Sequence, residues 1–587
     1  MKENNLAQKV NEEERSLTDG YNEYYAWLDQ LFYQSIGKLT FSLSPASITL
    51  AFCDWIIHLA SSPGKQVALS AQALELLKRY QCVLRGDQED KKCQYYLTDK
   101  RFKDSAWQKA PYKYYQQAFL YVEDWWKNAA CAPGTSEHHR DVIDFTLRQM
   151  LNFFSPTNFP FTNPEVLSTT IEQMGMNLFR GYKYFLKDLS KSLLGEPPES
   201  LQKFKAGRDV AITPGKVIYR NNLIELIQYS PSTKEVYAEP ILFVPAWIMK
   251  YYILDLSPQN SLVKYMVDKG HTVFMISWKN PMQEDRDLSF EDYIQLGIMD
   301  ALKVIKDICP KTSIHAAGYC LGGTLLTMAA AYLSRYNHQQ LKTVTLFAAQ
   351  TDFTEAGEIL LFVDESQINF LKKIMKQQGY LDKPQLKGTF QMLKSTDLIW
   401  SYMLRNYLLG VRKEPSDLMA WNADETRLPY RMHMQYLKNI YLKNDLAEGR
   451  FKVNQKPVAI QDVAVPIFCV ATVKDHISPW QSVHKIHLLA DTDVTFVLTS
   501  GGHNVGIVSN PDHPKAAYQI KTTPRNEVYL SPDRWEALAP HKKGSWWLAW
   551  QEWIAQASST KKVMARPAGN KNYKAIENSP GTYIYQT

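Results

Sequence analysis

The sequence predicts an α/β protein in which a mostly parallel sheet carries helices on both faces, preceded by a mainly helical region. After Gly215, short apolar runs alternate with helical patterns, which is typical of parallel strands connected by helices. Before about residue 205, apolar and aromatic residues recur at helical spacing instead. We therefore expect a helical N-terminal domain over residues 1–205, with 1–95 as its variable part, and an α/β domain over residues 206–587.

The helical region contains a well-marked first helix. Ser44 and Pro45 predict where it begins, because serine caps helices and proline fits their first turn. Apolar residues then recur at helical spacing: Ile48, Phe52, Trp55, Ile56 and Leu59. The run Ser61-Ser62-Pro63-Gly64 ends this helix, and residues 101–194 continue the helical pattern.

Eight apolar runs in the second region predict strands. They are residues 217–219, 223–229, 241–244, 272–278, 313–317, 344–348, 466–472 and 494–498. Helical patterns, such as 289–308 and 324–336, separate several of them. Residues 350–460 carry no convincing strand but several helical, aromatic-rich stretches, so we predict a cap inserted between two strands.

Composition excludes several classes of protein. The 587 residues are too many for one domain, and 45% hydrophobic residues are too many for a disordered chain. The net charge of +7 is small for this length, and no block of five like charges occurs, so we expect no nucleic-acid partner. No apolar run reaches the ~18 residues that a membrane helix needs.

The seven cysteines include no Cys-x-x-Cys pair, which argues against a disulfide framework, a zinc ribbon and secretion. The first thirty residues lack the apolar core of a signal peptide. No metal-ligand set stands out: His484 and His487 lack a third partner, and we expect them at the surface. These features predict a large, reduced, cytoplasmic protein without a metal or cofactor.

The central motif is Gly318-Tyr319-Cys320-Leu321-Gly322-Gly323, between a predicted strand and a predicted helix. It has the pattern of a nucleophile elbow with cysteine in place of serine, and predicts an α/β-hydrolase fold with Cys320 as nucleophile. A helix N-terminus at this position favours the thiolate. The alternative is a glycine-rich turn that holds an inert, buried cysteine.

The acid and the base should follow later strands, in the order nucleophile, acid, histidine. Asp475 follows the strand at 466–472, and His503 lies on a glycine-flanked loop after the strand at 494–498. His476, beside Asp475, is the rival base, and Asp475 has the alternative interpretation of an ordinary turn residue.

A developing oxyanion needs two backbone N–H donors. Leu321, directly after the nucleophile, should supply one of them. The second should come from the loop after the strand at 241–244, where Trp247 and Ile248 are both candidates.

A cysteine nucleophile favours acyl transfer over hydrolysis. Its thioester keeps the acyl group activated for attack by an alcohol, whereas a serine ester usually ends in hydrolysis. Attack by an alcohol also requires a base, a role open to His503. Water must be excluded, and an aromatic-rich insertion beside the site is what exclusion requires.

Several long motifs support a family assignment. They are Ser155–Glu165, Thr213–Val217 with Glu225–Tyr229, Lys250–Leu256, His271–Trp278, Gly318–Gly323, Trp421-Asn422 with Asp424, and Gly544–Trp547. Over residues 95–587 the sequence resembles polyhydroxyalkanoate synthases, specifically the longer, single-subunit-type enzymes of class I. It departs from them at Ala246, where the family usually has proline.

The resemblance implies an enzyme that polymerises (R)-3-hydroxyacyl-coenzyme A, preferably short-chain units such as 3-hydroxybutyryl-coenzyme A, into a polyester and releases coenzyme A. Cys320 would carry the growing chain, His503 would deprotonate it, and Asp475 would activate the attacking hydroxyl directly or through His503. It also implies a cap over the site, a homodimer, and attachment to cytoplasmic polymer granules. Trp421 would either contact substrate or pack in the cap.

Two alternatives stay open: a thioesterase or polyester depolymerase on the same fold, and a granule-coating protein without activity. For other conspicuous residues we expect structural roles. Asp255 should be a buried structural carboxylate, Cys469 an inert strand residue, and the cluster Trp546, Trp547, Trp550 and Trp553 core packing.

Overall fold

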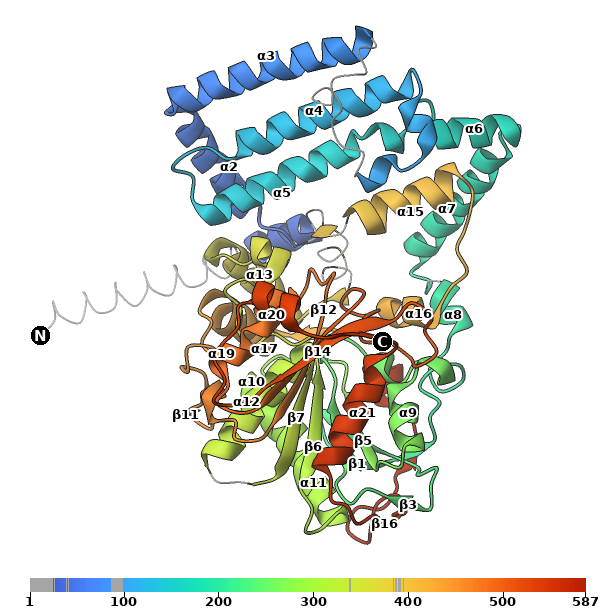
Figure 1. Cartoon of the computed structure of the whole chain (residues 1–587), viewed down its shortest axis with the longest axis vertical. Helices are drawn as coiled ribbons and strands as arrows, with labels where there is room; N and C mark the ends of the chain where they lie inside the picture. The colour runs from blue at the N-terminus through green and yellow to red at the C-terminus, as the bar shows by residue number, and fades with distance from the viewer. Residues whose placement is uncertain are drawn as a thin grey trace, which may run out of the picture. The chain divides into compact units, whose positions relative to one another are not determined.

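A computed structural model describes residues 25, 27–38, 40, 42–85, 99–197, 199–336, 339–383, 385, 388, 392–393 and 395–587 (Figure 1). They form two compact units. The first holds the described residues up to 197, residues 364–374 and those described within 384–414, whereas the second holds the rest. Segments of the insertion predicted at 350–460 therefore belong to each unit.

The first unit is helical. Its main helices are α2 (Pro45–Ala60), α3 (Pro63–Arg85), α4 (Tyr112–Ala130), α5 (Glu137–Phe153), α6 (Pro164–Glu172), α7 (Met176–Leu194) and α15 (Ser401–Met403). Helix α2 begins as predicted: the Ser44 hydroxyl accepts the N–H of Ser47 at 3.3 Å, and Pro45 lies in the first turn. The indole of Trp55 then donates to the carbonyl of Ala129 at 2.8 Å, which fixes α2 against the end of α4.

The second unit is built on one large sheet. Its order is β15 (His541–Lys543), β14 (Ala517–Thr523), β13 (Val494–Thr499), β12 (Ile467–Thr472), β7 (Leu341–Phe347), β6 (Ile314–Tyr319), β4 (Ile241–Val244), β5 (Val273–Trp278), β2 (Ile224–Tyr229), β1 (Gly215–Arg220) and β17 (Glu577–Asn578). The strands from β13 to β5 are parallel, and the outer strands are antiparallel. All eight predicted strands are present, whereas β14, β15 and β17 were not predicted.

Helices cover both faces of this sheet, as predicted. The helices of the second unit are α8 (Glu199–Lys203), α9 (Leu262–Asp268), α10 (Phe290–Asp292), α11 (Asp300–Ile308), α12 (Leu321–Arg335), α16 (Asp417–Ala423), α17 (Tyr430–Gln435), α18 (Trp480–His484), α19 (Ile486–Leu489), α20 (Pro532–Leu538) and α21 (Trp546–Ala557). Helix α13 (Glu365–Gln378) passes from the first unit to the second. Figure 1 shows α9 and α21 on one side of the sheet and α12 and α19 on the other.

The remaining paired strands are short. They are β3 (Glu235–Val236) with β16 (Val563–Met564), β8 (Tyr380–Leu381) with β9 (Leu428–Pro429), and β10 (Lys452–Val453) with β11 (Lys456–Pro457). The last two pairs lie within the insertion, where the sequence predicted no strand, because two-residue strands leave no periodic pattern.

The surface position predicted for His484 is wrong. It is 1% exposed, among the rings of Phe496, Trp535 and Trp480. Burial lowers the pKa of His484 to about 3, so the imidazole is neutral and packs as an aromatic group. The helical spacing of His484 and His487 did not reveal that α18, which ends at His484, is covered by Trp535 of the segment after β14.

Asp255 is fully buried, as predicted for a structural carboxylate. It accepts hydrogen bonds from Thr213 Oγ1 at 2.5 Å, Ser261 Oγ at 2.7 Å and the Tyr229 hydroxyl at 3.3 Å. Burial outweighs these donors and raises its pKa from 3.8 to about 6. The carboxylate therefore ties the segment before β1 to the segment after β4. When Asp255 is ionised, burial of its charge lowers the stability of the native state.

This cost should appear in the pH dependence of stability. Because the native state holds the Asp255 proton more tightly than the unfolded chain does, native stability falls as the pH rises from about 4 to 6. Asp255→Asn removes that loss and keeps an acceptor oxygen. We expect the melting temperature of D255N relative to wild type to rise between pH 4 and pH 6.5, by the equivalent of about 3 kcal/mol. Asp512→Asn, at an exposed carboxylate, is the matched control. A D255N difference as flat as that of the control would contradict the assignment.

Candidate active site

Cys320 occupies a sharp turn between β6, which ends at Tyr319, and α12, which begins at Leu321. Its backbone has φ +52° and ψ −126°, a conformation that non-glycine residues rarely adopt and that surrounding structure must stabilise. The N–H of Cys320 donates to the carbonyl of Phe347 at 2.8 Å, and its carbonyl accepts the N–H of Gly323 at 2.9 Å. Both neighbouring elements are buried, so the turn is rigidly held.

Two glycines of the motif are required by close backbone approach. A Cβ at position 318 would overlap the backbone of Gly323, one turn into α12. A Cβ at position 322 would overlap the carbonyl oxygens of Val244 and Pro245. Strand β6, the start of α12 and the loop after β4 therefore meet only because these positions have no side chain.

Asp475 and His503 meet beyond the ends of β12 and β13. The Asp475 Oδ2 atom lies 2.7 Å from His503 Nδ1, and its Oδ1 accepts the N–H groups of Ile477 and Ser478 at 2.9 Å each. Burial raises the pKa of Asp475, but the His503 charge and these hydrogen bonds outweigh it and leave the pKa below its ordinary value. Asp475 is therefore ionised, and it orients the imidazole through Nδ1.

His503 also faces Cys320. Burial lowers the pKa of this imidazole, but the charges of Asp475 and Cys320 and the hydrogen bond to Asp475 outweigh burial, so that the pKa lies well above its ordinary value. The structure thus brings the predicted nucleophile, acid and base together, although Cys320 and His503 are 183 positions apart in the chain. His476, the rival base, is the half-buried chain neighbour of Asp475.

The two predicted sources of oxyanion donors lie against each other. The N–H of Leu321 belongs to the first turn of α12, where helical N–H groups have no acceptor within the helix. The loop that contains Trp247 and Ile248 follows Pro245, whose carbonyl lies at Gly322. The ring of Trp247 is buried against Tyr293 and Tyr436, whereas Ile248 is half-buried. Which of the two donates stays a prediction.

Trp421 is a buried residue of α16 and is 3% exposed. Its indole N–H donates to the carbonyl of Lys250 at 2.7 Å, in the segment that follows the predicted oxyanion loop. This bond gives Trp421 a structural role beside the site, and a contact with substrate stays a prediction.

Two buried phenols near Cys320 were not singled out from the sequence. Tyr436 and Tyr441 lie on the π-helix η11 (Tyr436–Leu442), and their hydroxyls are 3.1 Å apart. Burial, and after it the charge of Cys320, raises the pKa of Tyr441, and the same two effects contribute to a raised pKa of Tyr436. In an α-helix, residues five apart point about 140° away from each other, so an α-helical pattern does not pair them. The i→i+5 hydrogen bonding of a π-helix brings residues five apart to the same side.

Trp546, Trp547 and Trp550 are core packing, as predicted, whereas Trp553 is half-buried against Phe468. Two of these tryptophans also hold the histidine loop. The indole of Trp546 donates to the carbonyl of Gly506 at 2.9 Å, and that of Trp547 donates to the carbonyl of Ile507 at 3.0 Å. Both indoles are buried, and the carbonyl of Ile507 also accepts the N–H of Ser509 at 2.9 Å. The tryptophans therefore support the loop that carries His503.

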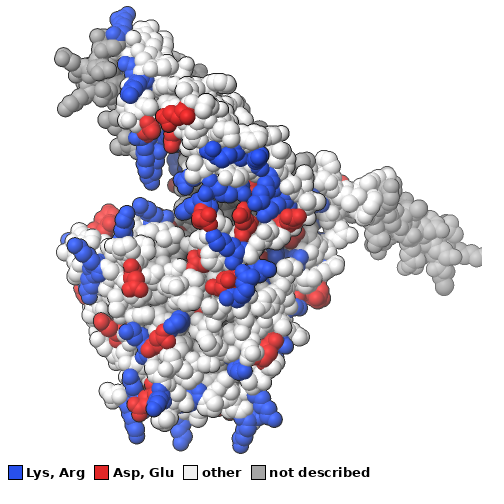
Figure 2. Space-filling model, turned by 90° about the vertical axis from the view of Figure 1, so that its right-hand side faces the viewer, with Lys and Arg blue, Asp and Glu red and all other residues white. Residues whose placement is uncertain are grey.

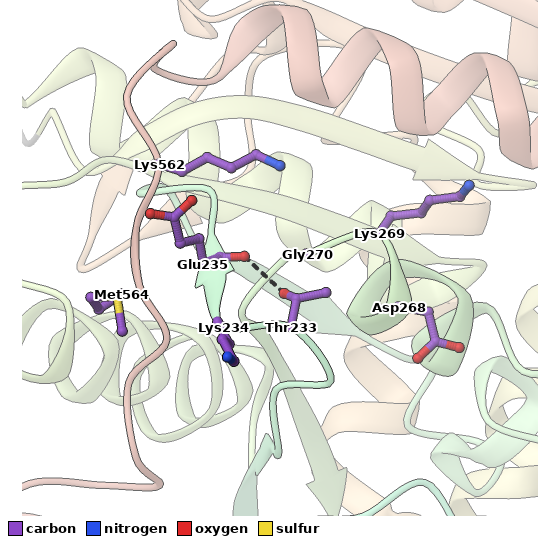
Figure 3. Close-up of a pocket in the computed structure, with 8 residues that line it drawn as sticks. All are labelled: Thr233, Lys234, Glu235, Asp268, Lys269, Gly270, Lys562 and Met564. Carbon is purple, nitrogen blue, oxygen red and sulfur yellow. Dashed lines mark hydrogen bonds between the residues drawn. The ribbon is translucent and has the colours of Figure 1, made fainter.

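A separate cavity of about 640 Å³ lies beside the β3–β16 pair (Figure 3). It is lined by Thr233, Lys234, Glu235, Asp268, Lys269, Gly270, Lys562 and Met564. Figure 3 shows that its lysine side chains point in different directions, so they do not converge on one anion. The cavity contains none of the residues gathered around Cys320.

Within the described part of the chain, no cluster of three or more His, Cys, Asp or Glu side chains is arranged to bind a metal ion. Among the helices that the structure describes, none combines the length and apolar character of a membrane span. On the face drawn in Figure 2, basic and acidic residues are interspersed, in keeping with the small net charge.

Comparison with known proteins identifies the family. Residues 98–266 match the model of the N-terminus of poly-beta-hydroxybutyrate polymerase (PhaC), residues 23–65 match a second model of that polymerase's N-terminal part, and residues 239–508 match the alpha/beta hydrolase fold. The fold expected from the elbow is thereby confirmed.

Curated relatives agree with these matches. The chain is 41% identical to the poly(3-hydroxyalkanoate) polymerase of Methylorubrum extorquens, over 83% of this chain and 80% of the relative. Identity is 40% to the polymerase subunit PhaC of Rhizobium etli, over 83% and 77%, and 34% to that of Cupriavidus necator, over 83% of each. The chain belongs to the poly(3-hydroxyalkanoate) polymerase family, which is the family that its motifs predicted.

Proposed function

We propose that this protein is an acyltransferase that polymerises (R)-3-hydroxyacyl-coenzyme A into a polyester and releases coenzyme A. The observation that carries the proposal is the position of His503, which hydrogen-bonds to Asp475 at 2.7 Å and faces the strained elbow residue Cys320 closely enough for the charge of Cys320 to raise its pKa. Family membership supplies the substrate class, because the curated relatives are poly(3-hydroxyalkanoate) polymerases.

The raised pKa of His503 favours an imidazolium paired with a Cys320 thiolate. In the first half-reaction, the thiolate attacks the thioester carbonyl of the substrate. The N–H of Leu321 and that of Trp247 or Ile248 stabilise the oxyanion. Coenzyme A leaves as a thiolate and takes the proton of His503, which leaves a neutral imidazole and an acyl thioester on Cys320.

In the second half-reaction, the 3-hydroxyl of another unit attacks this thioester. Neutral His503, oriented by Asp475, removes the hydroxyl proton, an ester bond forms, and the C–S bond to Cys320 breaks. The thiolate–imidazolium pair is restored. Asp475 accepting the hydroxyl proton directly is the variant of this step that the resemblance also allows.

We expect the site to favour transfer over hydrolysis because buried aromatic side chains lie around it. Trp247, Tyr436 and Tyr441 are buried beside the nucleophile and limit access of water. A thioesterase or depolymerase on this fold would need access of water to the acyl intermediate. Trp421, whose indole is bonded to the carbonyl of Lys250, is proposed to shape the site for short acyl chains.

We also propose a homodimer attached to polymer granules in the cytoplasm, as the family resemblance implies. Helix α7 supports an apolar attachment surface, because it exposes large apolar side chains: Phe179, Tyr182, Leu193 and Leu194 are 52%, 58%, 78% and 72% exposed. The homodimer and the granule as the site of attachment are proposed from the family resemblance.

Replacing the nucleophile tests the covalent step. Cys320→Ala should lower coenzyme A release from 3-hydroxybutyryl-coenzyme A by more than about 10³-fold and abolish polymer, because no thioester can form. The matched control is Cys131→Ala, at an exposed cysteine of the first unit, which should retain full activity. Undiminished release by the Cys320 variant would contradict the mechanism.

The identity of the base can be tested by thiol reactivity. Since the pKa of His503 is raised, the imidazolium persists as the pH rises through neutrality, and in the proposed mechanism the wild-type thiol should be alkylated rapidly near neutral pH. His503→Gln should shift this reactivity toward that of a free cysteine, whereas His476→Gln should leave it unchanged. If the two variants exchanged these outcomes, His476 would be the base.

Substrate range is measured with 3-hydroxyacyl thioesters of graded length. We expect the highest kcat/KM for short chains, insoluble polyester as product, and release of one coenzyme A per ester bond formed. Free hydroxy acid as the main product would show a hydrolase instead.

A further inference from the structure

Asn504, directly after His503, connects three distant parts of the second unit. Its Oδ1 accepts a hydrogen bond from the Tyr319 hydroxyl at 2.7 Å, and its Nδ2 donates to Asn422 Oδ1 at 3.0 Å. Tyr319 precedes the nucleophile on β6, and Asn422 lies on α16, within the insertion between β7 and β12. One carboxamide thus links the base, the nucleophile strand and a helix of the insertion.

Tyr319 is also packed on the base itself. Its ring centroid lies 5.6 Å from that of His503, with the planes inclined by 42°. Burial, with the charges of Cys320 and Asp475, holds the pKa of Tyr319 well above its ordinary value. The hydroxyl therefore stays protonated and donates a hydrogen bond. Asn504 Oδ1 is the acceptor, and this orients the amide so that Nδ2 faces Asn422.

The backbone of Asn504 belongs to the turn that α21 supports from behind. Its carbonyl accepts the N–H groups of Ile507 and Val508 at 3.1 and 3.0 Å, next to the carbonyls held by Trp546 and Trp547. The two tryptophans hold the loop at Gly506 and Ile507, and the Asn504 side chain holds it at residue 504. His503 directly precedes both attachments in the chain.

We infer that Asn504 is a positioning residue: it holds the His503 imidazole in line between Asp475 and Cys320 and links that alignment to α16. The inference rests on the proposed function, in which His503 exchanges protons with Cys320 and the substrate. The imidazole must keep its position in both protonation states, and a second attachment restricts the rotation of its loop.

Four variants separate positioning from simple stability. Asn504→Leu preserves size and removes both hydrogen bonds, and Tyr319→Phe preserves the ring and removes the donor. Asn422→Leu removes the contact to α16, whereas Asn422→Asp, the matched control, keeps an oxygen that accepts from Asn504. The readouts are the pH profile of Cys320 alkylation, kcat and KM for coenzyme A release, and the melting temperature.

We expect N504L to move the alkylation profile toward higher pH and to lower kcat about tenfold with little change in KM, because even 1 Å of misplacement costs up to roughly 100-fold in rate. Y319F and N422L should each show part of this effect, and N422D should match wild type. The N504L/N422L double variant should be no worse than N504L, because the two residues share one interaction.

Unchanged alkylation and kcat in N504L, at unchanged melting temperature, would overturn the inference. So would N422D failing as badly as N422L, or effects of N504L and N422L that multiply. Failure of the proposed function itself would look different, because wild-type Cys320 would then be alkylated like a free thiol. If N504L is too unstable to purify, Y319F and the two Asn422 variants decide the same question.

Discussion

The site depends on a close approach of three backbones: the end of β6, the first turn of α12 and the loop after β4. They meet because positions 318 and 322 carry no side chain. This approach forces Cys320 into a left-handed conformation, which the buried surroundings of β6 and α12 maintain. The same geometry places the first turn of α12 against the loop after β4, and these are the two predicted sources of oxyanion donors.

The second requirement is a stable charge on a buried imidazole. Desolvation alone would keep His503 neutral, but Asp475 on one side and Cys320 on the other reverse that preference. Asp475 in turn stays ionised because His503 and two backbone N–H groups compensate for its burial. Removing one of the three residues leaves a buried charge without its partner, so the charged state of each residue depends on the other two.

Much of this arrangement could be predicted from the sequence, because it depends on local chemistry. Glycines around Cys320 require a strand–turn–helix, and Asp475 and His503 follow apolar strands in the chain order of the fold. What could not be predicted depends on tertiary packing. The burial of His484, the pairing of Tyr436 with Tyr441 through a π-helix and the edge strand β15, which is fully exposed, leave no periodic signal in the chain. The tryptophans after Gly544 were predicted to be core residues, but their indole bonds to the histidine loop were not.

The central claim is that Cys320 carries the growing chain as a thioester. It is tested most directly by mass spectrometry of the peptide containing Cys320, after the protein has reacted briefly with 3-hydroxybutyryl-coenzyme A and has been quenched in acid. The account predicts that this peptide gains the mass of one or more 3-hydroxybutyryl units, which hydroxylamine removes. Polymer formation with an unmodified Cys320 peptide, or with the acyl group on another residue, would contradict it.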